Sequence, residues 1–274
     1  MAMVNKGTAD SVHIWARRQE AVDTCDKLEI ADVASTNLRR VLEGASLVIL
    51  ATPIGAMPEL ARGICKVAGT LDANFLVTDV GSVKAPVVEE VGGILKENGI
   101  SFIGSHPMAG SEQTGIEAST ADLFVGAPCI LTPGPDTAGD QASRLRRFWE
   151  GLGARVSELP PGTHDEIVGR ISHLPHIAAC ALAIAALELN SAAGAFAGSG
   201  FRDSTRIAGG DPELWLGILR ENRQALVNPL RDLHAQVGRA LAMIEDFDEE
   251  SVLQFLEQAR TLRKDNVSAA KPSS

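Results

Sequence analysis

Short apolar runs alternate with longer stretches of helical period through the first part of the chain. The apolar runs, rich in β-branched residues, cover residues 12–15, 47–51, 75–79, 101–104, 129–132 and 155–159. The helical stretches between them lie near residues 57–68, 84–97 and 139–151. Continuous apolar strands separated by helices are typical of a parallel sheet that is covered on both faces. The pattern predicts an α/β domain over residues 1–160.

The pattern changes after about residue 163, where strand signals stop and helical periodicity takes over. We expect an all-α domain over residues 161–274, with a kink or restart at Pro229 and a last helix beginning near Asp248. One apolar stripe recurs at steps of three or four and consists of Leu226, Leu230, Leu233, Val237, Leu241 and Ile244. The stripe has two interpretations, the inner face of a helical bundle or a subunit interface, and both can hold at once.

Composition narrows the kinds of partner. A formal net charge of -10 argues against nucleic acid, whose phosphates are bound by clustered Lys and Arg. The four cysteines form no C-x-x-C pair, which favours a reduced, cytoplasmic compartment. The most apolar run, Ile177 to Leu189, is shorter than the roughly 20 residues of a membrane-spanning helix. It is interpreted as a buried core helix, and no membrane partner is expected.

Ligands of a doubly wound sheet bind at the carboxyl ends of its strands, so the turns after the predicted strands carry the candidate chemistry. One turn begins Thr52-Pro53, a second contains Ser82, and a third is a Gly-rich loop with His106 and Glu112. A histidine accepts a proton near neutral pH, as the oxidation of a hydroxyl group by hydride loss requires. The alternatives are a structural histidine at 106 and a helix N-cap at Ser82.

Four motifs together resemble those of the prephenate/arogenate dehydrogenases, in order and in spacing, over roughly residues 12–265. They are Thr78-Asp79-Val80-Gly81-Ser82-Val83-Lys84, Gly104-Ser105-His106-Pro107-Met108-Ala109-Gly110, Ser172-His173-Leu174-Pro175-His176 and Gly200-Phe201-Arg202-Asp203-Ser204-Thr205-Arg206. The resemblance implies a Rossmann-like parallel sheet domain followed by a helical dimerisation domain, and therefore a homodimer. It also implies NAD(P)-dependent oxidative decarboxylation of a small molecule, prephenate or arogenate, in tyrosine biosynthesis.

The resemblance also implies roles for individual residues. His106 would take the hydroxyl proton, with Ser82 holding it and the substrate, and His173 would lie in the active site. Arg206 and Arg202 lie four apart, on one face of a helix, and a guanidinium pairs well with a substrate carboxylate. Each arginine has an alternative as a structural ion pair, for example with Asp203.

Three further residues are implied less directly. Glu112 would shape the mouth of the substrate site, although a solvated loop carboxylate is an equal alternative. Thr52 and Pro53, with Ser82, would contact the dinucleotide. The spacing His173-x-x-His176 invites a metal, but we expect none, because no third ligand lies at a sensible spacing.

One expected feature is missing from the sequence. A Rossmann unit opens with a strand, a G-x-G-x-x-G turn and a helix that receive the pyrophosphate, and no such turn is found in this chain. The run at residues 12–15 resembles the second strand of the family. Loss of the central first strand would leave an unpaired gap in the sheet. We interpret the chain as an amino-terminally shortened member of the family, with a non-catalytic protein that still dimerises as the alternative.

Two further patterns concern the cofactor and a rival activity. The predicted strand at 12–15 is followed by Ala16-Arg17-Arg18, where NAD-selective proteins place an acidic residue. An arginine pairs with a 2′-phosphate, so NADP is expected over NAD.

Other β-hydroxy-acid dehydrogenases would use a lysine in the helical domain. No lysine lies between Lys96 and Lys264, which disfavours that alternative.

Overall fold

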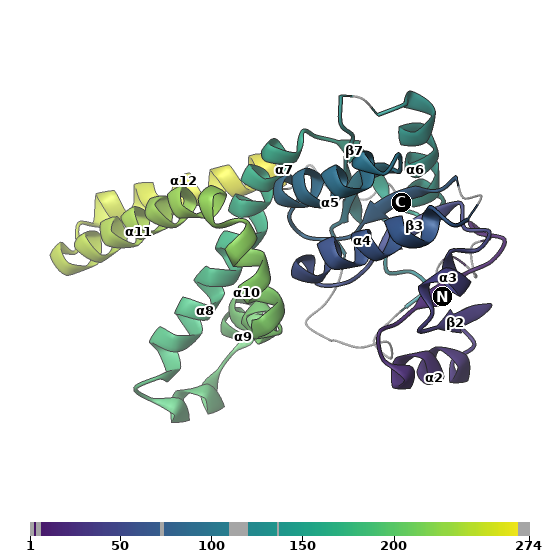
Figure 1. The fold of residues 1–274 in the computed structure, drawn as a ribbon. Coiled ribbons are helices and arrows are strands. Elements are labelled where there is room, and N and C mark those ends of the chain that lie inside the picture. The colour runs from purple at the N-terminus through teal and green to yellow at the C-terminus, as the bar shows by residue number, and fades with distance from the viewer. Residues whose placement is uncertain (1–2, 4–6, 72–73, 110–119, 136, 268–274) are drawn as a thin grey trace. The chain divides into compact units, whose positions relative to one another are not determined.

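The computed structural model describes residues 3, 7–71, 74–109, 120–135 and 137–267 (Figure 1). Its internal contacts divide the chain into two compact units, Met1–Arg223 and Gln224–Ser274. The first unit holds the α/β part and several helices, and the second holds the two long helices at the carboxyl end. The boundary near residue 160 between an α/β and a helical domain therefore stays a prediction.

The strands and helices of the α/β part alternate as the hydrophobic pattern indicates. Its strands are β1 (His13–Trp15), β2 (Val33–Ser35), β3 (Leu47–Leu50), β4 (Leu76–Asp79), β5 (Ser101–Pro107), β6 (Pro128–Thr132) and β7 (Arg155–Glu158). Its helices are α2 (Gln19–Lys27), α3 (Leu38–Leu42), η1 (Ile54–Ala56), α4 (Met57–Ala68), α5 (Ala85–Glu97) and α6 (Gly139–Gly151). Strand β2 was not expected, because its three residues form too short a run to stand out.

The strands form two separate sheets. β1 and β2 pair in parallel as one sheet, and the order of the other is β3-β4-β5-β6-β7. β1 and β3 are not hydrogen-bonded to each other in the described chain, which agrees with the expected gap in the sheet. The larger sheet is mixed, because β6 runs antiparallel to β5 whereas its other neighbours pair in parallel. The expected parallel sheet thus contains one antiparallel pairing, which the sequence pattern did not indicate.

Two apolar clusters cover the larger sheet. One joins β3 and β4 to α4 and α5, with Met57, Ala61 and Leu95 wholly buried. The other packs α6 against β4, β5 and β6 through Leu145 and Trp149. Every residue of β4 is buried, whereas the apolar residues of β1 are only half-buried. β1 is therefore less well covered by the surrounding structure than β4.

The remainder of the first unit is helical. Its elements are α7 (Pro161–Val168), η3 (Gly169–His173), α8 (Leu174–Leu187), η4 (Ser191–Phe196), α9 (Ser199–Thr205), η5 (Arg206–Gly209) and α10 (Pro212–Glu221). η3 is a π-helical turn, a wider turn that often marks a functional site. It joins α7 to α8 without a break, so that Pro161–Leu187 forms one helical stretch.

Helix α8 is more exposed than the sequence indicated. Ala179 is buried, whereas Leu182 is 43% and Ile184 is 58% exposed. The prediction of a buried core helix was wrong for the single chain, because only His176 and Ala179 of this apolar helix are buried. By length and composition alone, Pro161–Leu187 is also apolar enough to cross a membrane, a test that core helices of soluble proteins pass as well. The absence of a membrane partner stays a prediction.

The second unit contains α11 (Arg223–Asp246) and α12 (Glu249–Val267). α11 is continuous through Pro229, so the expected restart does not occur. Pro229 lies within the second turn, where its missing N–H removes one bond near the helix start. In the apolar stripe Leu226 is buried, but Val237, Leu241 and Ile244 are more than half exposed.

A tight contact between β5, β6 and α5 yields a first prediction. A Cβ added at Gly104 would lie 2.5 Å from Thr132 Oγ1 and 3.2 Å from Lys84 Cδ. We expect Gly104→Ala to lower the free energy of unfolding by about 1–3 kcal/mol through overpacking. The matched control is Gly93→Ala in α5, where a Cβ meets nothing within 4 Å. There, alanine's better helix propensity should stabilise the chain by about 0.5–1 kcal/mol. Equal denaturation midpoints for the two variants would contradict the packing argument.

Candidate active site

His106 lies on strand β5, not in a loop beyond it. Its backbone pairs with Ile130 of β6, and the pairing runs from Gly104 to Pro107. The sequence expectation of a Gly-rich loop at this residue was wrong, because the antiparallel partner extends the strand through a segment that resembles a turn. The imidazole is 7% exposed, and the strand gives it a fixed backbone.

A chain of hydrogen bonds runs from His106 to a carboxylate on α7. His106 Nδ1 lies 2.8 Å from His164 Nε2, and His164 Nδ1 lies 2.7 Å from Asp165 Oδ1. The His106 and His164 rings meet edge to face, with centroids 5.1 Å apart. His164 is wholly buried and Asp165 is 5% exposed. The chain of contacts therefore lies in the protein interior, away from solvent.

Asp165 also caps helix α5. Its Oδ1 accepts the backbone N–H of Lys84 at 2.7 Å, and its Oδ2 accepts that of Ala85 at 2.8 Å. The first turn of a helix has unpaired N–H groups that favour a negative charge. The alternative interpretation of Ser82 as the N-cap was wrong, because the carboxylate of Asp165 performs that function. Ser82 is half-buried, at the carboxyl end of β4.

A buried ion pair lies beside this cap. Lys84 Nζ bonds Asp79 Oδ2 and also donates to Ser105 O at 2.9 Å. Asp79 accepts the backbone N–H groups of Gly81 and Ser105 as well. Burial raises the pKa of Asp79 and lowers that of Lys84, while the attraction between the two opposes both shifts. The pair fixes the backbone just before His106.

A second histidine approaches the same region from η3. His173 is 1% exposed, and its Nδ1 lies 2.9 Å from Asn222 Nδ2. Asn222 Nδ2 also donates to the backbone oxygen of Asp165 at 2.9 Å. His173 Nε2 is buried with no hydrogen-bond partner among the described residues. We call His106, His164, Asp165, His173 and Asn222 the histidine cluster.

Burial keeps the two outer imidazoles of the cluster neutral. Desolvation lowers the pKa of His106 well below its usual value, and the neighbouring His164, Lys84 and His173 lower it further. Desolvation also lowers the pKa of His173 to about 4, against the attraction of Asp165. A neutral imidazole carries one bare nitrogen, which is the form that a general base requires.

His176 lies one turn beyond His173 and packs against Trp215. The two rings are stacked with centroids 3.5 Å apart, while His173 meets the same indole edge to face at 6.0 Å. His176 also hydrogen-bonds the backbone of Ile207 in η5. No group of three or more His, Cys, Asp or Glu side chains in the described part of the chain could hold a metal ion.

The two arginines expected to bind substrate lie on adjacent elements. Arg202 in α9 donates from Nε and from one terminal nitrogen to the backbone oxygen of Ala197, at 3.1 and 2.8 Å. Arg206 begins η5, which packs against α8, the helix that carries His176. Both side chains are exposed. Residue 206 therefore lies next to the residue whose backbone contacts His176.

The residues expected to contact a dinucleotide lie at the carboxyl ends of β1 and β3. Arg17 and Arg18 follow β1 and are exposed, and Pro53 precedes η1. The hydroxyl group of Thr52 is buried without a hydrogen-bond partner among the described residues. An unmatched hydroxyl group after β3 and two cationic groups after β1 are each of a type that can contact a dinucleotide, although the sequence supplies no glycine-rich turn for the pyrophosphate. Glu112 lies outside the described residues.

The sequence analysis missed His164, Asp165 and Asn222. The signal available was a polar His-Asp pair at the start of a predicted helical region, which gave no hint of its distant partners.

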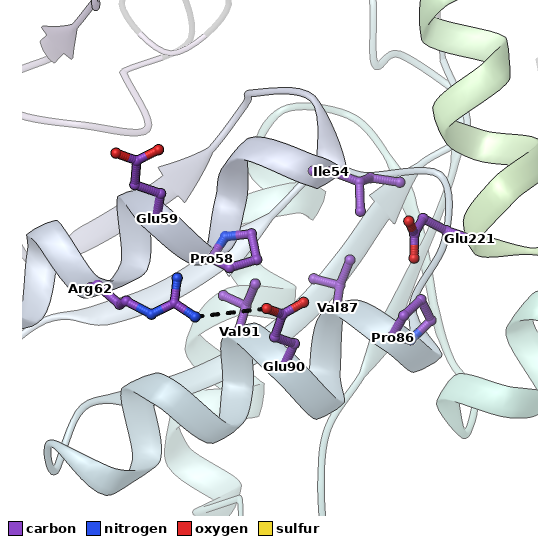
Figure 2. Close-up of a pocket in the computed structure, with 10 residues that line it drawn as sticks. Ile54, Pro58, Glu59, Arg62, Pro86, Val87, Glu90, Val91 and Glu221 are labelled. Atoms are coloured by element: carbon purple, nitrogen blue, oxygen red, sulfur yellow. Dashed lines mark ion pairs between the residues drawn. The ribbon is translucent and has the colours of Figure 1, made fainter.

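A cavity of about 250 Å³ elsewhere in this unit lies between α4 and α5, with Glu221 at its rim (Figure 2). Arg62 and Glu90 face each other across it, 3.9 Å apart. None of the residues of the histidine cluster lines that cavity.

Two family models match the chain. Residues 1–158 match the nucleotide-binding domain of prephenate dehydrogenase, and residues 160–258 match its dimerization domain. A prephenate dehydrogenase of Bacillus subtilis is 32% identical over 244 residues, which cover 86% of this chain. This aligned region spans 64% of the length of the Bacillus protein.

Two solved structures have the same fold. The prephenate dehydrogenase of A. aeolicus, in complex with hydroxyphenyl propionate and NAD+, has a TM-score of 0.86 and 28% identity, covering 96% of this chain and 92% of that one. The Synechocystis arogenate dehydrogenase has a TM-score of 0.75 and 31% identity, covering 93% and 91%. The expected Rossmann-like domain with a helical dimerisation domain is confirmed. The chain belongs to the prephenate/arogenate dehydrogenase family.

Proposed function

We propose that the protein is an NAD(P)-dependent dehydrogenase that oxidatively decarboxylates prephenate or arogenate in tyrosine biosynthesis. The observation that carries the proposal is the neutral, buried His106, held through His164 by Asp165 in a chain of this family. The arrangement resembles the way in which a carboxylate orients a catalytic histidine in hydrolases. It provides a base of fixed orientation, as removal of a hydroxyl proton requires.

The proposed reaction assigns one proton transfer to His106. Its bare ring nitrogen accepts the proton of the ring hydroxyl group as the carbon that bears this group loses a hydride. A bound nicotinamide dinucleotide supplies the hydride acceptor. The electron pair of the breaking bond to the ring carboxylate then completes the aromatic ring, and carbon dioxide leaves. Because His106 is buried, water competes little for its lone pair.

The other residues bind and orient. Arg206 is proposed to pair with a substrate carboxylate, supported by its exposed side chain beside the His176 contact. The buried His173 provides a further polar contact to the substrate. Ser82, between β4 and α5, is proposed to hold the substrate hydroxyl group and His106. Arg202, whose guanidinium bonds Ala197 O, is proposed as a second and weaker substrate contact. Glu112 stays a proposal from the family motif alone.

We further propose a preference for NADP over NAD. The support is the exposed pair Arg17 and Arg18 after β1, which suits a 2′-phosphate. Thr52, with its unmatched buried hydroxyl group, and Pro53 would line the dinucleotide site at the end of β3.

Homodimer formation is proposed through the helical part. The support is the dimerization-domain match and the exposed apolar side chains of α8, α11 and α12, among them Ile184, Leu241 and Leu256. We also propose a cytoplasmic location. The four free cysteines support it, because a reducing compartment keeps thiols unpaired.

A second candidate function is a non-catalytic protein that dimerises without binding a dinucleotide. The separation of β1-β2 from the larger sheet favours it, since the dinucleotide of this fold binds where the central strands meet. The other alternative is a β-hydroxy-acid dehydrogenase with a lysine base in its helical domain. It is disfavoured, because no lysine lies between Lys96 and Lys264 in the sequence.

The base role predicts a characteristic pH profile. Because burial lowers the pKa of His106 below the usual 6.5, log kcat/KM should stay flat through pH 6.5 and fall only at lower pH. His106→Gln should reduce kcat/KM by about 10²- to 10⁴-fold, measured with prephenate and with arogenate. The control is His234→Gln, an exposed residue of α11, which should leave turnover unchanged. Undiminished turnover of His106→Gln would remove His106 from the mechanism.

The two arginines provide a matched pair of variants. Arg206→Gln should raise KM by about 10- to 100-fold, as expected for loss of a hydrogen bond to a charged group. Arg202→Gln should raise KM less, because Arg202 is proposed as the weaker of the two substrate contacts. Steady-state kinetics at saturating cofactor measures both. An equal or larger effect at residue 202 would reverse the two assignments.

Cofactor binding separates the enzyme from the non-catalytic candidate. Calorimetric titration of the purified chain with NADP+ and NAD+ should show tighter binding of NADP+. Replacing Arg17 and Arg18 with serine should weaken NADP+ binding by about tenfold or more and leave NAD+ binding unchanged. No heat with either nucleotide, from a chain that sediments as a folded dimer, would favour the non-catalytic candidate.

A further inference from the structure

The histidine cluster contains enough hydrogen-bond partners to decide where its protons lie. A neutral imidazole has one N–H donor and one bare acceptor nitrogen, and the partner of one nitrogen determines the role of the other. Each assignment must therefore begin from a group whose role is fixed. Two such groups occur in the cluster, the carboxylate of Asp165 and the amide group of Asn222.

Asp165 acts only as an acceptor. Both of its carboxylate oxygens already receive a backbone N–H, from Lys84 and Ala85, and a backbone N–H has no other role. A carboxylate whose two oxygens both accept backbone N–H groups acts as the acceptor toward a third partner as well. His164 Nδ1, 2.7 Å from Oδ1, must therefore carry the proton of that bond.

The role of His164 then fixes that of His106. With its proton on Nδ1, a neutral His164 presents a bare Nε2, which must accept the bond from His106. His106 therefore carries its proton on Nδ1, and its Nε2 holds the lone pair. A doubly protonated His164 would reverse this assignment. That form would place a cation in a wholly buried site.

Asn222 fixes His173 in the opposite sense. A backbone oxygen only accepts, so the nitrogen of the Asn222 amide group, not its oxygen, faces Asp165 O. The same nitrogen lies 2.9 Å from His173 Nδ1 and donates its second hydrogen there. His173 Nδ1 is therefore bare, and the proton of His173 lies on Nε2. This is the buried nitrogen that has no partner among the described residues.

We propose that His164, Asp165 and Asn222 are positioning residues that hold the proton of His106 on Nδ1 and the proton of His173 on Nε2. His106 then offers a lone pair at Nε2, while His173 offers an N–H at the same position of its ring. The pair suits a ligand that presents a hydroxyl proton to one imidazole and an oxygen acceptor to the other. This significance for substrate rests on the proposed dehydrogenase function, whereas the proton positions do not.

The proton positions are measurable without turnover. Long-range 1H–15N correlation spectra of the full chain, labelled with 15N at histidine, distinguish a bare ring nitrogen from a protonated one. Assignment uses single His→Gln variants of the six histidines. We expect a bare Nε2 for His106 and a protonated Nε2 for His173 above pH 7. The opposite tautomer at His106 in the unmodified chain would overturn the proposal, whatever the variants show.

Two variants test the positioning residues separately. His164→Phe removes the acceptor of His106, so His106 should change from one tautomer to a mixture while His173 keeps its own. Asn222→Leu removes the donor to His173, so His173 should change to a mixture of tautomers while His106 keeps its own. The exposed His234 is the internal control, and its signals should not move in either variant. If both histidines kept their tautomers in both variants, the positioning roles would be refuted. Circular dichroism confirms that each variant is folded, and His164→Gln, which retains a hydrogen-bonding group, replaces His164→Phe if it is not.

Kinetics separates this proposal from the proposed function. If the chain turns over, His164→Phe should lower kcat by about tenfold or more with little change in KM, because the orientation of the base is lost and substrate contacts remain. Expected tautomers without any dehydrogenase activity would leave the positioning roles in place and reject the function. Dehydrogenase activity together with the opposite tautomers would reject the positioning roles and leave the proposed function in place.

Discussion

The carboxylate of Asp165 connects the parts of the first unit that bear its chemistry. It accepts two backbone N–H groups at the start of α5, and it also holds His164. Asn222 at the end of α10 bonds the backbone of the same residue. A buried carboxylate is tolerated only when its oxygens are matched by donors, and here helix capping supplies them. The carboxylate of Asp165, which caps the start of α5, thus also orients the side chains around His106.

A buried ion pair supports the strand that carries His106. The Lys84–Asp79 pair is wholly buried and bonds the backbone on either side of Ser105. Breaking one partner of such a pair leaves an uncompensated buried charge, which is costly. The pair therefore works as a rigid support for β5, whereas the imidazole of His106 stays neutral. The positive charge of Lys84 adds to burial in lowering the pKa of His106, so the imidazole stays in the neutral form that can accept a proton.

Much of the fold followed from the apolar pattern, and much of the site did not. Strands β3, β4, β6 and β7 lie within a residue or so of the expected runs, because buried parallel strands are short and continuously apolar. Strand β5 extends to Pro107 because of its pairing with β6, which no local pattern reveals. The motifs located His106 and His173. His164 remained hidden, because its partner His106 lies 58 residues away and a buried histidine looks like any other in sequence.

The π-helical turn at η3 has a geometric consequence for the cluster. In a regular α-helix each residue rotates by about 100°, so side chains nine positions apart, as 164 and 173 are, point in nearly opposite directions. The wider turn at Gly169–His173 unwinds the stretch between α7 and α8 and reduces that angle. A regular α-helix of the same length would leave these two side chains about 180° apart and would turn His173 away from His164. The local widening of one helical turn thus allows two imidazoles from different turns to share one interior.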